Sequence, residues 1–240
     1  WRLPIVYVLY ALANLSKPRA LGLFPVLIAL ELYGERFSSR AQAGKLALRV
    51  ALRVLLLAAI SAGVVWANML GHERTIVAPP GGSLLAALLT DSEVLARYLA
   101  NALAPVQLSA AYYVEPITGV GDPRLWLYGA AVGAVVCVTV WLADNRRRAV
   151  FAWAWFFTAL LPQLNLVALS HAMQDRYLYL SMPGFFLALA EASAGLTRRL
   201  SFVDARVWRV AAGAYVLALA LLGVFRGEVF SSTFALFHDA

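Results

Sequence analysis

Apolar and polar positions follow one another along this chain in long blocks. Seven apolar runs cover residues 3–15, 20–33, 50–70, 125–143, 150–169, 177–195 and 208–225. Several of them approach or exceed the roughly 18–20 residues that an α-helix needs to cross a bilayer. The pattern predicts an all-α fold, namely a polytopic bundle of about seven transmembrane helices of which the first two are short.

The composition agrees with this class of protein. Of the 240 residues, 62% are hydrophobic and 14% are charged, against about 45–50% and about 25% in soluble domains. A soluble domain of this size could not bury so much apolar surface, so we expect a single transmembrane domain over 1–240. The single cysteine, Cys137, excludes an internal disulfide framework. The chain opens at Trp1 without an initiator Met, and we expect it to be a piece of a longer protein.

Basic residues gather in alternate connections between the runs. The three clusters are Arg36, Arg40, Lys45 and Arg49; then Arg146, Arg147 and Arg148; then Arg198, Arg199, Arg206 and Arg209. Because cytoplasmic loops of membrane proteins are enriched in Lys and Arg, these connections are predicted to lie in the cytoplasm. The segments 16–19, 71–124 and 170–177 and the C-terminus then face the extra-cytoplasmic side. This topology accounts for the net charge of +7, so no nucleic-acid partner is expected.

The long outer segment 71–124 contains one expected helix. Thr90-Asp91-Ser92-Glu93 has the form of a capping box that starts a helix. Apolar residues recur behind it at helical spacing, and Pro105 should end the helix. We therefore expect an amphipathic helix over 92–104. It either lies along the outer membrane surface or packs on the bundle, and the sequence leaves both arrangements open.

Three basic residues are exceptions on the outer side. Lys17 and Arg19 flank Pro18 in a very short connection, and Arg176 stands at the head of the run that begins with Tyr177. An arginine fork and a mobile lysine ammonium can clamp a phosphate. At that depth the phosphate would belong to a lipid head group or a lipid-linked substrate. The alternative is that these cations only reach toward the interface, as we expect of Arg53 inside the run 50–70.

The stretch "ALSHAMQDRYLYLSMPGF", residues 168–185, adds more polar groups than interfacial anchoring requires. The candidate lipid-phosphate site therefore consists of Lys17, Arg19, His171, Gln174, Asp175, Arg176 and Tyr177. Asp175 either neutralises Arg176 or orients its guanidinium toward a ligand. His171 and Asp175 are four residues apart and would share a helix face, but the sequence offers no third ligand, so no metal site is predicted.

Four stretches resemble, in order along the chain, bacterial membrane proteins related to the TMTC O-mannosyltransferases. These are "LANLSKPRALGLFPVLIALELYG", "LARYLANALAPVQLSAAYY", "RRRAVFAWAWFFTALLPQLNLVALSHAMQDRYLYLSMPGF" and the tail "FRGEVFSSTFALFHDA". The resemblance implies a GT-C type glycosyltransferase of the bacterial inner membrane. Such an enzyme moves a sugar from a polyprenyl-phosphate donor to an extra-cytoplasmic acceptor. It also implies that tetratricopeptide repeats follow the membrane domain.

The resemblance carries over Lys17, Arg176 and, with them, His171 and Asp175 as a pocket for the donor phosphate or the acceptor. The family's catalytic acidic motif would lie upstream, and "SMPG" at 181–184 departs from the family's usual Pro-Ser order. The catalytic residues are therefore unknown, and Glu73, Asp91 and Glu115 are not nominated. No organic cofactor is expected, and whether a divalent metal assists the leaving phosphate stays open. The alternative function is a non-catalytic integral membrane subunit within a larger membrane complex.

Overall fold

The computed structural model describes residues 2–16, 18–34, 40–71, 79–106, 108–109, 112–165 and 172–229. Within these residues every regular element is helical, apart from an isolated antiparallel bridge between Tyr112 and Met173. The all-α fold expected from sequence is therefore confirmed for the described chain.

Eight α-helices and four short 3-10 helices make up the described elements. The α-helices are α1 (Arg2–Ser16), α2 (Leu23–Gly34), α3 (Arg40–Gly71), α4 (Leu84–Leu103), α5 (Pro123–Leu142), α6 (Arg146–Leu160), α7 (Met182–Arg199) and α8 (Ala205–Val229). The 3-10 helices are η1 (Pro18–Gly22), η2 (Pro80–Gly82), η3 (Leu161–Gln163) and η4 (Asp175–Tyr177).

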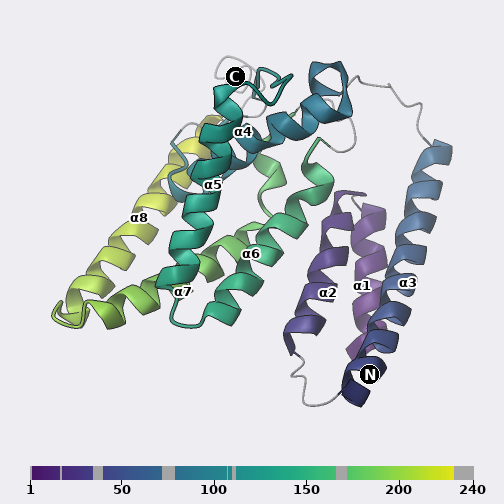
Figure 1. Ribbon diagram of the computed structural model, residues 1–240, viewed down its shortest axis with the longest axis horizontal. Coiled ribbons are helices and arrows are strands. Elements are labelled where there is room, and N and C mark those ends of the chain that lie inside the picture. The colour runs from purple at the N-terminus through teal and green to yellow at the C-terminus, as the bar shows by residue number, and fades with distance from the viewer. Residues whose placement is uncertain are drawn as a thin grey trace.

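Apart from α4, successive α-helices run in opposite directions between two ends of the molecule (Figure 1). At one end α2, α5 and α7 finish and α3, α6 and α8 begin; we call this the basic end, because Arg146–Arg148, Arg198 and Arg199 lie there. At the opposite end α4 lies across the tops of the other helices, together with 112–122, η3 and η4 (Figure 1). We call this the capped end.

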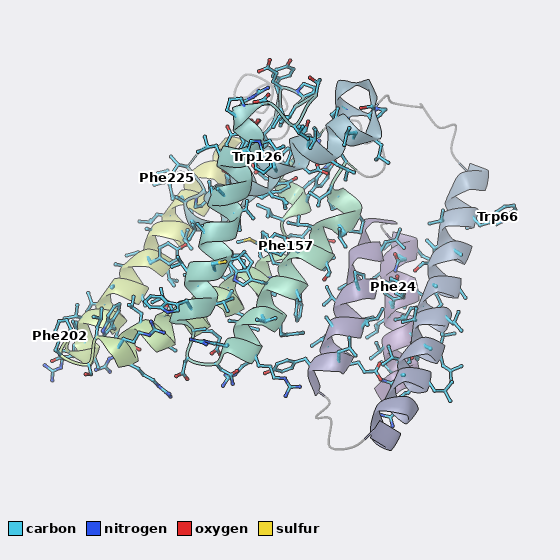
Figure 2. The ribbon with its side chains drawn as sticks, in the orientation of Figure 1. Phe24, Trp66, Trp126, Phe157, Phe202 and Phe225 are labelled. Atoms are coloured by element: carbon cyan, nitrogen blue, oxygen red, sulfur yellow. The ribbon has the colours of Figure 1, made fainter. Side chains whose placement is uncertain are left out.

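Each of the seven apolar runs overlaps one α-helix. Three of these α-helices are long and apolar enough to cross a membrane. The three stretches are Ala47–Ala67, Pro123–Leu142 and Ala205–Phe225. Large side chains point outward along them (Figure 2): Trp66, Trp126 and Phe225 are 67%, 67% and 66% exposed. Soluble proteins rarely expose such extended apolar surface. These helices indicate a membrane protein.

Two of the expected helix limits are wrong. In the described part of the run 150–169, the α-helix ends at Leu160 and the 3-10 helix η3 follows; the run 177–195 becomes an α-helix only at Met182. Proline explains both limits, because Pro162 and Pro183 each occupy the first turn of the helix that follows. Proline is tolerated in a first turn, where its missing N–H costs nothing, and it breaks a helix interior.

Helix α4 begins at Leu84, earlier than the boundary expected at residue 92. Its N-cap is Ser83, whose hydroxyl accepts a hydrogen bond from the Ala86 N–H at 3.1 Å. The expected capping box is therefore wrong: Thr90 lies inside the helix and donates to the Ala86 carbonyl at 2.7 Å. The helix ends at Leu103, as Pro105 predicts.

The inner face of α4 belongs to the main hydrophobic core. Val94, Tyr98, Leu99 and Ala102 are buried against residues of α6, α7 and 172–178. Of the two arrangements that the sequence left open, α4 thus takes the one in which it packs on the bundle. Burial of these side chains stabilises the packing by roughly 25 cal/mol per Å² of apolar surface.

The core depends on a close contact between α6 and α7. A side chain at Gly184 would meet the Ala152 carbonyl oxygen at 2.6 Å and the Phe156 nitrogen at 2.7 Å. At the other end of α7, a side chain at Gly195 would collide with the Leu142 carbonyl oxygen. Glycine at both positions lets the backbone of α7 lie directly on α6 and on the turn that joins α5 to α6.

Charged groups fasten the same turn at the basic end. Glu191 of α7 is buried, accepts the Asn145 N–H at 3.1 Å and forms an ion pair with Arg148 at 3.0 Å. Arg198 pairs with Asp144 of the turn at 2.5 Å. Beside it, Tyr33 of α2 stacks on Phe151 of α6, with ring centres 4.6 Å apart, and this contact joins α1–α3 to the rest.

We predict that Gly184→Ala and Gly195→Ala each destabilise the fold, because the added methyl group forces α7 away from its neighbours. Overpacking of this kind costs about 1–3 kcal/mol, and Tm falls by about 2–4 °C per kcal/mol in a chain of this size. The matched control is Gly133→Ala on α5, where an added Cβ meets nothing within 4 Å. Thermal unfolding in detergent measures all three, and equal Tm values would contradict the prediction.

Candidate functional site

The expected lipid-phosphate site falls partly outside the described residues. Lys17 and His171 lie outside them, as does the side chain of Arg19, whose backbone forms part of η1. The other four members, Gln174, Asp175, Arg176 and Tyr177, lie together in and beside η4 at the capped end. Only these four can be placed as side chains.

Asp175 is bound to the outer segment. Both of its carboxylate oxygens accept the Tyr112 hydroxyl, at 2.8 and 2.9 Å. The carboxylate also accepts the Asn101 side-chain amide at 3.1 Å and the Ser109 N–H at 2.7 Å. These bonds tie η4 to α4 and to 109–112. Burial, followed by the bond to Asp175, raises the pKa of Tyr112.

Arg176 takes a different partner. Its Nε donates to the side-chain oxygen of Gln174 at 2.7 Å, and its guanidinium carbon lies 5.9 Å from the centre of the Tyr177 ring. The residue is exposed, and no carboxylate among the described residues forms an ion pair with it. The guanidinium is therefore positioned by a neutral amide, and no described carboxylate offsets its positive charge.

Gln174 and Tyr177 serve as the buried support for Arg176. Gln174 is 4% exposed and Tyr177 is 2% exposed. The hydroxyl of the fully buried Tyr98 accepts the Gln174 N–H and donates to the Gln174 carbonyl, both at 3.2 Å. Burial raises the pKa of Tyr98, so this phenol stays neutral and keeps both bonds. Tyr177 was expected as a ligand contact, and it lies in the core instead.

A second polar cluster lies nearer the start of α4, on its buried face. Asp91 accepts the Asn165 side-chain amide at 2.7 Å, and its second oxygen is buried without a hydrogen-bond partner. The neighbouring Thr90 hydroxyl accepts the Ile117 N–H at 2.8 Å. Burial raises the pKa of Asp91, and the two bonds from Asn165 oppose that shift.

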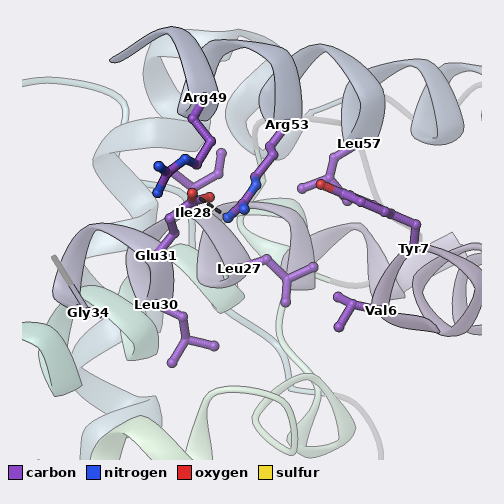
Figure 3. Close-up of a pocket in the computed structure, with 10 residues that line it drawn as sticks. All are labelled: Val6, Tyr7, Leu27, Ile28, Leu30, Glu31, Gly34, Arg49, Arg53 and Leu57. Carbon is purple, nitrogen blue, oxygen red and sulfur yellow. Dashed lines mark ion pairs between the residues drawn. The ribbon is translucent and has the colours of Figure 1, made fainter. Parts of the chain in front are cut away.

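The basic end contains a cavity of about 420 Å³ between α1, α2 and α3. Glu31 of α2 forms an ion pair with Arg53 of α3, and the Arg49 side chain reaches the same space from one helical turn away (Figure 3). The side chains of Arg53 and Glu31 are 24% and 12% exposed. Arg53 is thus paired across the helices and does not simply reach for the interface.

Sequence reasoning did not single out this cavity. The usable signal was the pair Arg49 and Arg53, four residues apart at the start of the apolar run 50–70, together with Glu31, the one charged residue in the run 20–33. Residues four apart share a helix face, but nothing in the sequence indicates that this face of α3 packs on Glu31.

Comparison with protein-family models, with curated proteins and with solved structures gives no significant match. Among the described residues, no group of three His, Cys, Asp or Glu side chains is arranged to hold a metal ion.

We predict that Asp91→Asn changes how stability depends on pH. The unfolded carboxyl ionises near pH 3.8, whereas the folded carboxyl holds its proton to higher pH. Above 3.8 the folded state binds more protons, so the stability of the parent protein falls as the pH rises through the raised pKa. Asparagine removes this fall. The Tm of Asp91→Asn should therefore gain on that of the parent as the pH rises above about 4.

Asp122→Asn supplies the control of opposite sign. Hydrogen bonds from Arg124 hold the pKa of Asp122 below its usual range, so the ionised carboxylate contributes stability that is lost as the pH falls through the lowered pKa. The cost of Asp122→Asn should shrink toward low pH. Parallel Tm curves for Asp91→Asn and the parent would show that Asp91 does not titrate differently on folding.

Proposed function

We propose that this chain is the donor-side part of a GT-C type membrane glycosyltransferase, and that its capped end binds the phosphate of a polyprenyl-phosphate sugar. One observation carries the proposal: the Arg176 guanidinium is exposed at the capped end, with Gln174 as its hydrogen-bond partner and no described carboxylate paired with it. An arginine held in this way presents a fixed fork of N–H donors that suits phosphate.

Two further observations support a phosphate site at Arg176. Gln174 is anchored on both sides of its peptide by Tyr98, so the guanidinium starts from a rigid base. Leu180 follows a few residues later and lies near Gly22 of η1, where a side chain would meet it at 3.1 Å. The described part of η1 therefore runs close to this segment.

In the proposed reaction an acceptor hydroxyl attacks the anomeric carbon of the donor sugar, and the bond to the lipid phosphate breaks. The acceptor proton goes to a carboxylate base, and the electron pair of the broken bond goes to the phosphate. Arg176, with Lys17, would stabilise the charge that develops on this leaving group. His171 and Asp175 stay assigned to the same pocket, Asp175 as the residue that positions η4. The base would come from outside the described residues.

The topology proposed with this function places the basic end in the cytoplasm of a bacterium, beneath the inner membrane. Positive residues are retained on the cytoplasmic side, and the exposed arginines of the basic end fit that rule. The capped end would then face outward, together with the C-terminal end of α8. The partners in this setting are membrane lipid and the polyprenyl-phosphate sugar, with further protein partners where the chain belongs to a complex.

A non-catalytic membrane subunit is the alternative function. One observation favours it: every carboxylate side chain that the structure describes has an ion-pair or hydrogen-bond partner. Their partners are Arg53 for Glu31, Asn165 for Asp91, Arg97 for Glu93, Arg124 for Glu115 and Asp122, Arg198 for Asp144, Tyr112 for Asp175, Arg148 for Glu191 and the Arg206 N–H for Asp204. None of them stands ready as a general base in the described chain.

We predict that Arg176→Gln weakens binding of a polyprenyl phosphate by about tenfold or more, since a hydrogen bond to a charged group contributes about 1.5–3 kcal/mol. Arg176→Lys keeps the charge and loses the fork, so its loss should be smaller. The matched control is Arg124→Gln, because Arg124 lies at the same end but is paired with Asp122 and Glu115. Titration of the purified protein in phosphatidylcholine nanodiscs measures the affinities.

Equal affinity in the parent and in Arg176→Gln would contradict the phosphate site. If the site is present, transfer from a radiolabelled polyprenyl-phosphate sugar by the full-length protein separates the two functions. Turnover that falls in Arg176→Gln supports the transferase, and binding without turnover supports the subunit.

A further inference from the structure

A groove of about 820 Å³ runs between α7 and α8. Helix α8 lies at one edge of the molecule and is joined to α7 by the short turn 200–204 of the basic end (Figure 1). Most of the lining is apolar, with Phe186 and Leu189 on α7 and Ala212 and Leu219 on α8. The groove extends from the basic end toward the last residue of α4, Leu103.

A membrane would surround this groove. Its α8 wall belongs to Ala205–Phe225, a stretch with a mean hydropathy of 1.9 that is long enough to cross a bilayer. No residue of that stretch is buried in the chain. Contact between these walls and water is unfavourable, so we expect hydrocarbon to fill the groove. A lipid chain or a further helix can supply it.

The hydroxyl groups of the lining already have partners. Ser193 and Thr197 each donate to a carbonyl of their own helix, at 2.7 and 2.8 Å. Tyr215 donates to the Leu103 carbonyl at 2.9 Å, a bond that connects α8 to α4. None of these hydroxyls therefore needs an acceptor from a ligand.

Two side chains at the basic end of the groove differ from the rest of its lining. The indole Nε1 of Trp208 is buried and has no hydrogen-bond partner among the described residues. Arg209 beside it is exposed, and its Nε donates to the Ala205 carbonyl at 3.4 Å. No carboxylate of the described chain forms an ion pair with Arg209. A buried donor without an acceptor is costly, so an anionic group with acceptor oxygens at this level would stabilise both side chains.

These two side chains favour a lipid over a further helix as the occupant. The backbone carbonyls of a transmembrane helix are bonded within that helix, so its backbone offers few acceptors to Trp208. Trp208 and Arg209 lie in the first two turns of α8, the level at which a bilayer presents its ester and phosphate oxygens. Tryptophan is enriched at that level, and basic pockets between transmembrane helices bind lipid head groups.

From this juxtaposition we propose that the groove between α7 and α8 holds an anionic phospholipid from the leaflet at the basic end. One acyl chain lies along the apolar walls. Trp208 donates to an ester or phosphate oxygen of the lipid, and Arg209 lies against its phosphate. The site is separate from the one at Arg176, which lies at the opposite end of the bundle, and it does not rest on the proposed transferase function.

Three substitutions test the three parts of this site. Trp208→Phe removes the N–H donor and keeps an aromatic ring, and it should weaken retention of dioleoyl phosphatidylglycerol by roughly two- to tenfold. Arg209→Gln should weaken it by about tenfold or more, because a charge-assisted bond is lost. Ala212→Leu places a larger side chain in the groove and should weaken retention of any lipid. Native mass spectrometry of the full chain in detergent, with titrated lipid, measures retention.

Matched controls accompany each substitution. Ala214→Leu makes the same change at an exposed residue of α8 that does not line the groove, and Arg206→Gln removes an exposed arginine outside it. Both should retain lipid as the parent does. Arg209→Lys keeps the charge and should keep most of the affinity. Dioleoyl phosphatidylcholine carries no net charge, so its retention should fall in Trp208→Phe and Ala212→Leu and change little in Arg209→Gln.

Several outcomes would overturn the proposal. Equal retention in Ala212→Leu and the parent, at equal Tm, would show that no lipid occupies the groove. Loss of a dimer in Ala212→Leu, with lipid retention unchanged, would assign the groove to a second copy of the chain. Equal losses of the two lipids in Arg209→Gln would remove the anionic head group. If Ala212→Leu fails to fold, unchanged retention in Trp208→Phe and Arg209→Gln would contradict the site by itself. Arg176→Gln should leave phosphatidylglycerol retention unchanged, and a loss there would place the lipid at the capped end.

Discussion

The direct contact of the α7 backbone with α6 is the constraint on which the rest of this fold depends. Gly184 and Gly195 permit it at the two ends of α7. With α7 in place, Trp153 donates to the Thr139 hydroxyl on α5 at 2.9 Å, and Trp155 donates to the Leu180 carbonyl at 3.1 Å. The first bond fixes α5, and the second fixes the segment that leads from η4 into α7. The position of Arg176 therefore follows from helix packing that lies well below it.

Polar side chains then determine how the cap sits on this bundle. Apolar contacts are not directional, so α4 and the described segments around η3 and η4 need hydrogen bonds to fix their register. Two carboxylates supply them: Asp91 binds Asn165, and Asp175 binds Tyr112. In a buried setting such bonds are strong, and a polar group without a partner is costly. The bonds of Asp175 to Tyr112 and Asn101 hold the cap in place, and the adjacent Arg176 is bound by the neutral side chain of Gln174.

Seven of the eight described α-helices could be predicted from sequence because each of them overlaps an apolar run; α4, in the segment 71–124, followed from the helical spacing of its apolar residues. The short connections predicted that successive α-helices run in opposite directions between the two ends of the molecule. Pro105 predicted the end of α4. The prediction failed where a local signal had two meanings. Thr90-Asp91-Ser92-Glu93 has the spacing of a capping box, but Ser83 caps the helix and Asp91 binds Asn165, 74 residues away in sequence. Proline inside the apolar runs limited α6 and α7 more strictly than hydropathy suggested.

The site could be predicted only as a group of residue types. The sequence placed Gln174, Asp175 and Arg176 together, but their roles depend on partners from α4 and from 109–112 that no short-range pattern reveals. The same holds at the basic end, where Glu31 and Arg53 meet only because α2 and α3 pack side by side. Asp175 is held by Tyr112, Asn101 and Ser109, and the adjacent Arg176 is held by Gln174. The arginine of the proposed phosphate site is thus positioned by contacts that only the folded chain brings together.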